Sequence, residues 1–379
     1  MKGHVRKRGN KWCFVVDIGR DEVTGKRIQK WFHGYEKEKD AERAMIDKIK
    51  EINDGTYIEE TDETFGDFME NWLVNKKNQV RPGTWKSYNW LIKTHLIPHL
   101  GKVKVIQLKP RHLNDLYNQK LLNVISANSI KKLHGLIKDA LDDGIGFGDI
   151  SKNVANAVTP PRVKKVKFEV WTEDQLKQFL DEAKKNRFYV AFELAASTGM
   201  RIGEILGLRW RDVDLDGHKL SVRQAYTKGY SGYEFHEPKT ASGERSIALF
   251  SDTVDLLKEY KEKQEAEKEE QEAFYKDHGL VIQTHIGTPV SPRNLSREYY
   301  KILKKLDIPQ IRFHDLRHTH ATLLLKRGIH AKIVQERLGH SSITITLDTY
   351  SHVLPGLQEA ALKSLGGSII GPENPEKPL

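Results

Sequence analysis

Five short stretches in the second half of the chain place arginine, lysine, histidine and tyrosine among apolar residues. They are residues 197–204, 236–249, 313–320, 333–342 and 346–352. Arginine binds the non-bridging oxygens of a phosphodiester through two parallel hydrogen bonds. Histidine donors stabilise the pentacoordinate state, an activated tyrosine attacks phosphorus, and lysine or histidine protonates the departing oxygen. Together these residue types indicate transfer of a phosphodiester to tyrosine without a metal ion.

Arg201 follows a helix pattern of apolar residues over 188–196, which stops at Thr198-Gly199. An arginine this close to the core must be paired with a carboxylate or bound to an anion. Glu204 is near enough to pair with Arg201 and fix its orientation. The stretch therefore fits an anion-binding arginine, and it also fits a plain structural ion pair.

Lys239 lies in a stretch with the pattern of a β-hairpin. Ser242-Gly243 is the predicted turn, residues 246–250 are the predicted return strand, and Lys239 is at the approach to the tip. A lysine on a flexible hairpin can reach a leaving oxygen and act as a mobile acid. The stretch says little by itself, because the chain contains 62 lysines and arginines.

His314 and Arg317 are three residues apart where an apolar helix pattern begins, so they share one helix face. Asp315 stands where a helix start favours a carboxylate. His314 and His318 also have the i, i+4 spacing of a helical zinc pair, but no glutamate is adjacent and no cysteine is near. We therefore expect no metal here, and we interpret His318 and His320 as structural.

Gly339 fits the position just after a helix end, which fixes His340 at a turn, and Tyr350 follows it. A tyrosine is a poor nucleophile at its ordinary pKa of roughly 10. It therefore needs nearby cations or a base. A two-metal nuclease would need clustered Asp and Glu, and no such cluster stands out. The residues predict chemistry with neither metal nor cofactor.

The composition points to a polyanionic partner. The chain has 379 residues, 62 Lys and Arg against 52 Asp and Glu, and a net charge of +10. With 38% hydrophobic and 30% charged residues it is typical of soluble globular proteins, and no apolar run is long enough to span a membrane. The N-terminus lacks a signal-peptide pattern.

The single cysteine, Cys13, excludes an internal disulfide and is expected to be a buried hydrophobe in a reducing compartment.

The length favours several domains, and we predict three, over residues 1–58, 62–160 and 166–379. The first has strand patterns over 12–18 and 27–32 and a helix pattern over 38–52, which predicts a small three-stranded sheet with one helix. Its first 35 residues carry nine Lys and Arg against three acids. A basic sheet suits a DNA groove, and a solvated hairpin explains the charge as well. The predicted contacts are Arg6, Lys7, Lys11, Lys26, Arg27 and Lys30.

The second domain is predicted to be an all-α bundle of four helices, with starts at Thr64, Pro82, Pro110 and Asn128. Between residues 75 and 138 it has 13 Lys and Arg, and the only acid is Asp115. Charge of one sign costs stability, because like charges repel along a helix, so phosphate neutralisation is the natural explanation. The predicted DNA contacts are Lys76, Lys77, Arg81, Lys86, Lys93, Lys131 and Lys132.

The third domain, which contains all five reactive stretches, is predicted to be mixed and mainly α, with a small antiparallel sheet. The chain as a whole is therefore expected to be a multidomain α+β protein. Pro160-Pro161 and the basic run after them form the predicted linker before this domain.

In this order and at these spacings, the five stretches resemble the tyrosine recombinase family, the lambda-type integrases. The matching pieces are Thr-Gly-Met-Arg201-Ile-Gly-Glu204, Pro-Lys239-Thr-Ala-Ser-Gly-Glu-Arg245, His314-Asp-Leu-Arg317-His, Leu-Gly-His340-Ser-Ser and Tyr350. The match covers roughly residues 165–355. The basic helical domain resembles the family's core-type DNA-binding domain. The N-terminal domain resembles the arm-type DNA-binding domain of phage and conjugative-transposon integrases.

The resemblance implies that Arg201 and Arg317 clamp the scissile phosphate, that Glu204 supports Arg201, and that His340 donates a hydrogen bond to a phosphate oxygen. Relatives often carry proline at the position of Ala248, and this difference has no evident catalytic consequence.

For the reaction itself, the resemblance implies that Tyr350 forms a 3′-phosphotyrosyl bond and releases a 5′-hydroxyl. Lys239 is then the general acid toward the 5′ oxygen. His314 assists proton transfer, either by taking the tyrosine proton or by donating to phosphate.

The resemblance further implies a homotetramer on double-stranded DNA, which binds core and arm-type sites and exchanges strands through a Holliday junction. An excisionase or a DNA-bending protein is a possible accessory partner, and the place of action is the cytoplasm, at the bacterial nucleoid. Residues 357–365 would dock on a neighbouring protomer, and packing within the chain fits them equally.

Three other functions share this fold and remain open from the sequence. A type IB topoisomerase uses the same chemistry but needs no second sequence-reading domain. A recombinase that resolves replicon dimers or inverts DNA would usually lack the N-terminal domain. A DNA-binding regulator without catalysis would not need all six candidate catalytic residues.

Overall fold

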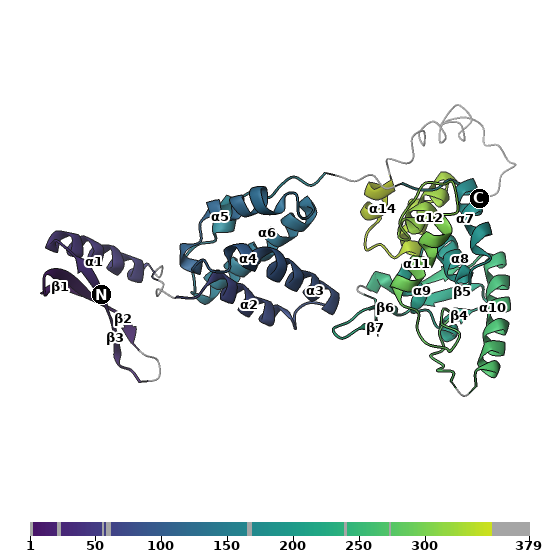
Figure 1. The fold of residues 1–379 in the computed structure, drawn as a ribbon, viewed down its shortest axis with the longest axis horizontal. Helices are drawn as coiled ribbons and strands as arrows, with labels where there is room; N and C mark the ends of the chain where they lie inside the picture. Colours follow the sequence, from purple (N-terminus) through teal and green to yellow (C-terminus); the bar gives the residue numbers. More distant parts are fainter. Residues whose placement is uncertain are drawn as a thin grey trace, which may run out of the picture. The chain divides into compact units, whose positions relative to one another are not determined.

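The computed structural model describes residues 3–20, 24–54, 57, 62–164, 169–238, 241–272 and 274–350. These residues belong to two compact units, which divide between Lys165 and Val166 (Figure 1). Lys239 and the segment over residues 357–365 expected to dock on a neighbouring protomer lie outside the described residues. The fold class predicted from the sequence is confirmed, since helices predominate and small antiparallel sheets occur in both units.

The first unit begins with a three-stranded antiparallel sheet. Its strands are β1 (Gly3–Arg8), β2 (Lys11–Arg20) and β3 (Arg27–Tyr35), in the order β1-β2-β3. Because side chains alternate along a strand, Phe14 and Val16 point to one face, where they pack against Ala41 of α1 (Glu38–Asn53). No helix among the described residues of this domain covers the other face of the sheet.

The rest of the first unit is helical and contains the four predicted helical runs. Its elements are α2 (Phe65–Lys76), α3 (Pro82–Trp90), α4 (Ile97–Leu100), α5 (Pro110–Asp115) and α6 (Ala127–Phe147). A π-helical turn, Leu91–Leu96, joins α3 to α4, and a second one, Leu116–Leu121, continues α5. Thr64 caps α2 as predicted, whereas α6 is capped by Ser126 rather than beginning at Asn128. Phe65, Leu91 and Ile137 are among the core residues.

The second unit is a mainly helical domain around one large apolar core. Its helices are α7 (Glu173–Ala183), α8 (Tyr189–Thr198), α9 (Ile202–Leu206), α10 (Ser251–Glu270), α11 (Pro292–Leu303), α12 (Asp315–Lys326), α13 (Ala331–Leu338) and α14 (Ile343–Tyr350). At the centre of the core lie the aromatic rings of Trp171, Phe179, Phe192 and Tyr299.

The short strands of this unit differ from the hairpin predicted around Lys239. Strand β8 (Arg245–Ala248) pairs with β5 (Lys219–Val222), which also pairs with β4 (Val213–Asp214). Strand β7 (Tyr233–His236) pairs instead with β6 (Ala225–Lys228). The two strands that flank Lys239 therefore belong to different sheets and do not form a hairpin together. Turn residues at 242–243 indicated a reversal, but the pairing partners are distant in sequence and could not be read from it.

Two left-handed glycines end the helices that precede predicted site residues. Gly199 (φ +67°) ends α8 and Gly339 (φ +66°) ends α13, as the sequence indicated. A Cβ at Gly199 would lie 2.7 Å from Leu338 Cδ2 and 2.8 Å from His320 Cδ2. Glycine is therefore required at 199 both by its backbone conformation and by the close approach of α12 and α13.

We expect Gly199→Ala to destabilise the domain more than Gly328→Ala does. Gly328 also has a positive φ, of +80°, but no described atom lies within 4 Å of the position that a Cβ would take there. Both substitutions incur left-handed strain of about 1–2 kcal/mol, and only the first adds a clash with the core. Thermal unfolding of the two variants measures the difference. Equal losses of stability would show that the neighbouring helices yield without cost.

Candidate active site

Arg317 of α12 joins the turns that carry two other predicted site residues. Its guanidinium donates from Nη1 to the carbonyl of Gly199 at 2.8 Å and from Nη2 to the carbonyl of Leu338 at 2.6 Å. Gly199 stands two residues before Arg201, and Leu338 stands two residues before His340. A single buried side chain thus fixes both turns against the start of α12.

Arg317 has no carboxylate partner among the described residues, although its side chain is only 3% exposed. Burial and then the charge of Arg201 lower the pKa of Arg317 to about 9, although Glu204 acts in the opposite direction. A buried cation without a carboxylate is costly unless an anion binds to it. This arrangement is suited to a phosphate.

Glu204 holds two arginines at once. Its Oε2 accepts the backbone N–H of Arg201 at 2.9 Å, and its Oε1 accepts Nη1 of the same residue at 2.7 Å. On the other side, Nη2 of Arg245 donates to Oε2 at 2.8 Å. The Arg201–Glu204 pair that the sequence suggested is therefore present. Arg201 remains half-exposed, so its remaining donors are open to a ligand.

Arg245 is a residue that the sequence analysis did not single out. It lies on β8, and its Nε donates to the carbonyl of Arg337 at 2.7 Å. Arg337 in turn donates to the carbonyls of Ser197 and Ala248. These contacts connect β8, α8 and α13 around Glu204. In the sequence it stood only as the last residue of the stretch around Lys239, just before the strand predicted over 246–250, and nothing there marked it as buried beside Glu204.

The charge of Glu204 is maintained by its two partners. Burial by itself would raise the pKa of Glu204, but the hydrogen bond and charge of Arg245, followed by the charge of Arg201, outweigh it and lower the pKa to about 2. Glu204 is thus an anion throughout the physiological range, and it neutralises Arg245 and part of the charge of Arg201.

Two predicted site histidines lie beside this group. His314 is the N-cap residue of α12, and burial followed by the charge of Arg317 lowers its pKa. His340 follows Gly339, and its Nδ1 lies 2.9 Å from Thr346 Oγ1. Burial, Arg317 and Arg201 lower the pKa of His340 to about 4. Both rings are therefore neutral at pH 7 and can each donate one N–H to an anion.

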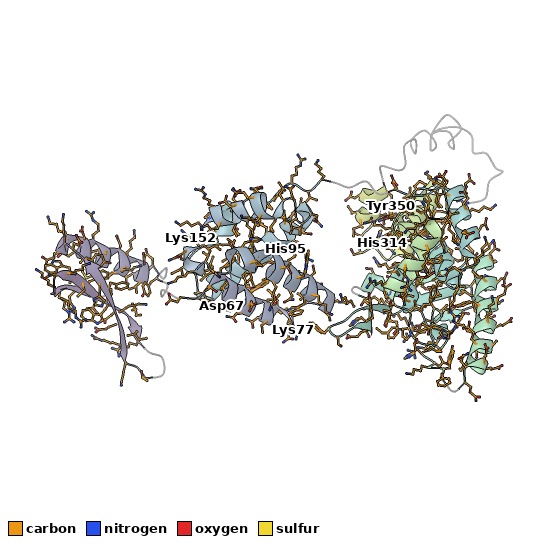
Figure 2. All side chains as sticks on the ribbon, viewed as in Figure 1. Asp67, Lys77, His95, Lys152, His314 and Tyr350 are labelled. Carbon is orange, nitrogen blue, oxygen red and sulfur yellow. The ribbon has the colours of Figure 1, made fainter. Side chains whose placement is uncertain are left out.

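Tyr350 ends α14 and is fully buried. Its ring packs in a small apolar cluster with Ala321, Leu325, Val334 and Leu338. Figure 2 labels Tyr350 and His314. The hydroxyl of Tyr350 lies 2.9 Å from Nδ1 of His318. Burial raises the pKa of Tyr350 to about 12, although Arg317 opposes the shift. The tyrosine is therefore neutral in this structure and needs a proton acceptor to become a nucleophile.

The interpretation of His318 as purely structural misses this contact. His318 touches the tyrosine hydroxyl, whereas Nδ1 of His320 donates to the carbonyl of Ala196 inside the core, as a structural histidine does. Two histidines two residues apart on one helix point in different directions. The sequence offered no way to decide which of them faces Tyr350.

The structure brings five of the predicted site residues together around Arg317. The charge of Arg317 acts on the pKa of His314, His340 and Tyr350, and Arg201 acts on that of Arg317 itself. Glu204 holds Arg201 within this group, and Lys239 lies outside the described residues. The cations and the neutral histidine donors are able to bind a phosphodiester, and the buried tyrosine beside them is able to attack it.

The predicted DNA contacts of the N-terminal domain divide between the two faces of its sheet. By strand alternation, the helix-free face carries Arg6, Lys11 and Arg27. The face that packs against α1 carries Lys7 and Lys30, and Lys26 precedes β3. On the helix-free face, the guanidinium of Arg6 stacks on Trp31 with its Cζ 4.0 Å from the ring centroid. We call this side, defined by Arg6, Lys11, Arg27 and Trp31, the open face.

The predicted contacts of the helical domain are partly engaged by other side chains. Lys76 pairs with Asp143 at 3.3 Å and Lys93 with Glu70 at 3.2 Å. Lys132 donates to Ser87 Oγ at 2.8 Å and lies over the ring of Tyr88. Arg81, Lys77 and Lys131 are exposed and Lys86 is half-buried. The basic surface thus includes α3 and the first turns of α6.

Among the described residues, no helix combines the length and apolar character that crossing a bilayer requires. Within the same residues, no three His, Cys, Asp or Glu side chains are grouped closely enough to hold a metal ion. Cys13 is buried and unpaired, as predicted.

Three family models match the chain in succession. Residues 4–52 match the Arm DNA-binding domain, residues 64–121 match the phage integrase N-terminal SAM-like domain, and residues 169–356 match the phage integrase family. The last match contains all the predicted catalytic residues.

Curated relatives match over nearly the whole chain. A tyrosine recombinase XerC-like protein of Caldanaerobacter subterraneus subsp. tengcongensis is 32% identical, over 96% of this chain and 98% of its own length. The ICEBs1 integrase of Bacillus subtilis is 24% identical, over 91% of this chain and 94% of its own length.

Solved structures share the fold. The Tn1549 transposon integrase, in complex with transposon right end DNA, has a TM-score of 0.68 at 21% identity and covers 80% of this chain and 99% of its own. A lambda integrase tetramer bound to a Holliday junction has a TM-score of 0.58 at 21% identity, over 90% of this chain and 96% of its own.

We expect Glu204→Gln to destabilise the protein at neutral pH and less so in acid. The folded-state pKa of Glu204 is depressed to about 2, so its charge stabilises the fold above the ordinary carboxyl pKa. That contribution is lost as the pH falls from about 4.5 toward 2, where the native side chain also becomes neutral. Urea unfolding of both proteins from pH 7 downward measures the convergence.

Glu173→Gln is the matched control for this measurement. Glu173 forms an exposed pair with Arg327, and exposed pairs contribute little. A Glu204→Gln deficit that is independent of pH, or no larger than that of the control, would contradict the role of Glu204 as the central anion.

Proposed function

The chain belongs to the tyrosine recombinase family, and on that premise we propose that it is the integrase of a mobile genetic element. As a member of the family it is an enzyme that breaks and rejoins DNA. It integrates and excises its element through a 3′-phosphotyrosyl intermediate and a Holliday junction. The observation that carries the proposal is the buried guanidinium of Arg317, which has no carboxylate partner among the described residues and lies close to Arg201 and Tyr350.

The scissile phosphate binds where the open donors converge. Arg201 and Arg317 contact its non-bridging oxygens, and His340 and His314 donate one N–H each. Glu204 positions Arg201 by holding it against Arg245. Two guanidinium groups supply the charge that stabilises the pentacoordinate state, so the proposed chemistry requires no metal and no cofactor.

In the cleavage step, Tyr350 loses its proton and its oxygen bonds to phosphorus, while the bond from phosphorus to the 5′ oxygen breaks. Lys239 gives a proton to that oxygen, which leaves as a 5′-hydroxyl. The phosphotyrosyl ester retains the bond energy. A 5′-hydroxyl from the partner DNA then gives its proton to Lys239 and attacks the ester, Tyr350 leaves and regains a proton, and the new strand is joined.

We assign DNA recognition to the two N-terminal domains, with domain limits of 1–58, 62–160 and 166–379. The open face of the N-terminal sheet fits arm-type sites, because a sheet can enter the major groove and the guanidinium of Arg6 is stacked on Trp31 on this face. The helical domain fits the core site through Arg81, Lys86, Lys131 and Lys132, and Lys76, Lys77 and Lys93 add charge beside them. Lys7, Lys26 and Lys30 fit phosphates at the margins of the sheet.

The assembly follows from the same family premise. Four copies on two DNA sites would exchange one pair of strands at a time, in the cytoplasm at the nucleoid. An excisionase or a DNA-bending protein would set the direction. The related lambda integrase was solved as a tetramer on a Holliday junction, which supports this arrangement.

Resolution of replicon dimers, or DNA inversion, is the second candidate function. Both use the same active site, and the presence of the N-terminal sheet domain favours the integrase. The same domain disfavours a type IB topoisomerase. A regulator without catalysis is disfavoured because Arg201, Arg317, His340 and Tyr350 are brought together with a geometry that DNA binding does not require.

We expect the purified protein to form a covalent adduct with DNA that spans the junctions of its element, next to its own gene. Quenching in SDS without added metal traps the adduct, and Tyr350→Phe abolishes it because the nucleophilic oxygen is gone. A suicide substrate, nicked near the crossover point, prevents religation and makes the assay sensitive.

Binding by the same variant is the control. Tyr350→Phe should retain the mobility shift of the wild-type protein on the same DNA. An adduct that survives the substitution would refute Tyr350 as the nucleophile. Tight binding by the wild-type protein with no adduct on the nicked substrate would favour the regulator.

We also expect Arg6→Ala to weaken binding to arm-type DNA by about 1–3 kcal/mol, since it removes a guanidinium that the open face presents to a base or phosphate. Lys39→Ala is the matched control, because Lys39 is an exposed cation on α1 on the opposite side of the sheet. Mobility shifts on DNA flanking the core site measure both. Equal effects of the two substitutions would indicate that α1, or charge in general, binds the DNA.

A further inference from the structure

We propose that His318 is a catalytic residue, whose Nδ1 accepts the proton of Tyr350 when the tyrosine attacks the scissile phosphate. The inference deepens the proposed function and rests on it, because it names the base for the same nucleophile. The sequence and its resemblance suggested His314 for this task. The geometry assigns it to the histidine one helical turn further along α12.

The contact between His318 and Tyr350 is direct. Nδ1 of His318 lies 2.9 Å from the tyrosine hydroxyl, and the two ring centroids are 5.7 Å apart. A general base must lie within about 2.6–3.2 Å of the group from which it takes the proton. His318 meets this requirement. His314 packs edge-on against the ring of His318, with 5.3 Å between the centroids, so it can hold that ring in place.

The position of Tyr350 makes the contact consequential. The ring is held between α12 and α13 by Ala321, Leu325, Val334 and Leu338, so it cannot turn toward another base without leaving the cluster. The hydroxyl is buried, and burial opposes ionisation. A base that is buried with the hydroxyl is therefore more effective than one that must reach it from solvent.

His318 is neutral and able to accept a proton. Burial, the neighbouring His314 and the cations Arg317 and Arg312 lower its pKa to about 4, and Asp315 partly opposes them. His340 faces it from the turn before α14, and Tyr350 faces it from α14. A histidine with so low a pKa would be a weak base if nothing else changed.

The bound DNA supplies the change that the base requires. A phosphate placed against Arg201 and Arg317 brings negative charge next to Arg317, one of the cations that lower the pKa of His318. Opposite charge nearby favours the protonated form of a histidine, so the pKa of His318 rises toward its ordinary value. The base becomes effective when the phosphate arrives, which links activation of the nucleophile to correct binding of DNA.

The proton balance is complete in both directions. In cleavage, the O–H bond of Tyr350 breaks and its proton goes to Nδ1 of His318, while the oxygen bonds to phosphorus and the 5′ oxygen leaves with a proton from the general acid. In rejoining, a 5′-hydroxyl gives its proton back to the general acid as it attacks phosphorus, the tyrosine oxygen leaves, and His318 returns the proton to that oxygen. No oxidant, metal or further reactant is consumed.

The test compares His318→Asn with the wild-type protein in single-turnover cleavage of a nicked suicide substrate across pH. The Oδ1 atom of asparagine stands where Nδ1 stood and accepts a hydrogen bond, but it does not take up a proton. We expect cleavage by the variant to be slower by about 10²–10⁴-fold. Its rate should keep rising with pH as hydroxide replaces the base, whereas the wild-type rate levels off. A variant rate within about threefold of wild type would overturn the proposal, because the contact would then only orient the tyrosine.

A 5′-bridging phosphorothiolate in the same substrate separates the two proton transfers. A thiolate leaves without a proton, so the sulfur substitution bypasses the general acid but not the base. We expect the deficit of His318→Asn to persist on this substrate. Recovery of the wild-type rate would overturn the proposal, since it would place His318 on the leaving-group side.

His285→Asn is the matched control, because His285 is an exposed histidine of the same unit, and it should cleave at the wild-type rate. Mobility shift and thermal unfolding check that His318→Asn folds and binds DNA. If the wild-type protein itself formed no adduct, the proposed function would fail. If wild type and His318→Asn reacted alike, this inference alone would fail.

Discussion

The arrangement of the active site depends on the two hydrogen bonds that Arg317 donates to main-chain carbonyls. Because those carbonyls belong to Gly199 and Leu338, one side chain sets the distance between the end of α8 and the end of α13. Arg201 and His340 follow these helix ends directly. Arg317 therefore acts as a structural tie, in addition to its proposed role as a phosphate ligand. Any change that displaced it would move both turns at once.

The same arginine leaves the site with an excess of positive charge. Glu204 is the buried anion that balances Arg201 and Arg245, and it does not hydrogen-bond Arg317 among the described contacts. The excess is visible in the histidines, since His314, His318 and His340 all have lowered pKa values. Burial is the largest cause for each of them, and the charge of Arg317 contributes to all three. The site therefore holds neutral histidines around Arg317, a cation that no described carboxylate balances. Binding of a phosphate relieves the cation and raises the basicity of the rings together.

Much of this fold could be predicted from local sequence, because local rules decide it. Thr64 caps α2, Gly199 and Gly339 end α8 and α13, and the Arg201–Glu204 spacing places both groups at one helix start. Pairing between distant strands could not be predicted in this way, and the expected hairpin around Lys239 is wrong for that reason. Arg245 was missed because its partner, Glu204, lies on a different element far away in the sequence.

The choice between the histidines of α12 shows where sequence reasoning ends. His314, Arg317 and His318 lie on the first turn and a half of one helix, so periodicity places all three on one broad side. Which of them meets the tyrosine depends on how α14 packs, and that is decided by the apolar cluster that receives the ring of Tyr350. The cluster seats the ring between α12 and α13, and the hydroxyl then reaches His318. In the proposed mechanism, hydrophobic packing of Tyr350, rather than the spacing of the polar residues, therefore selects the base.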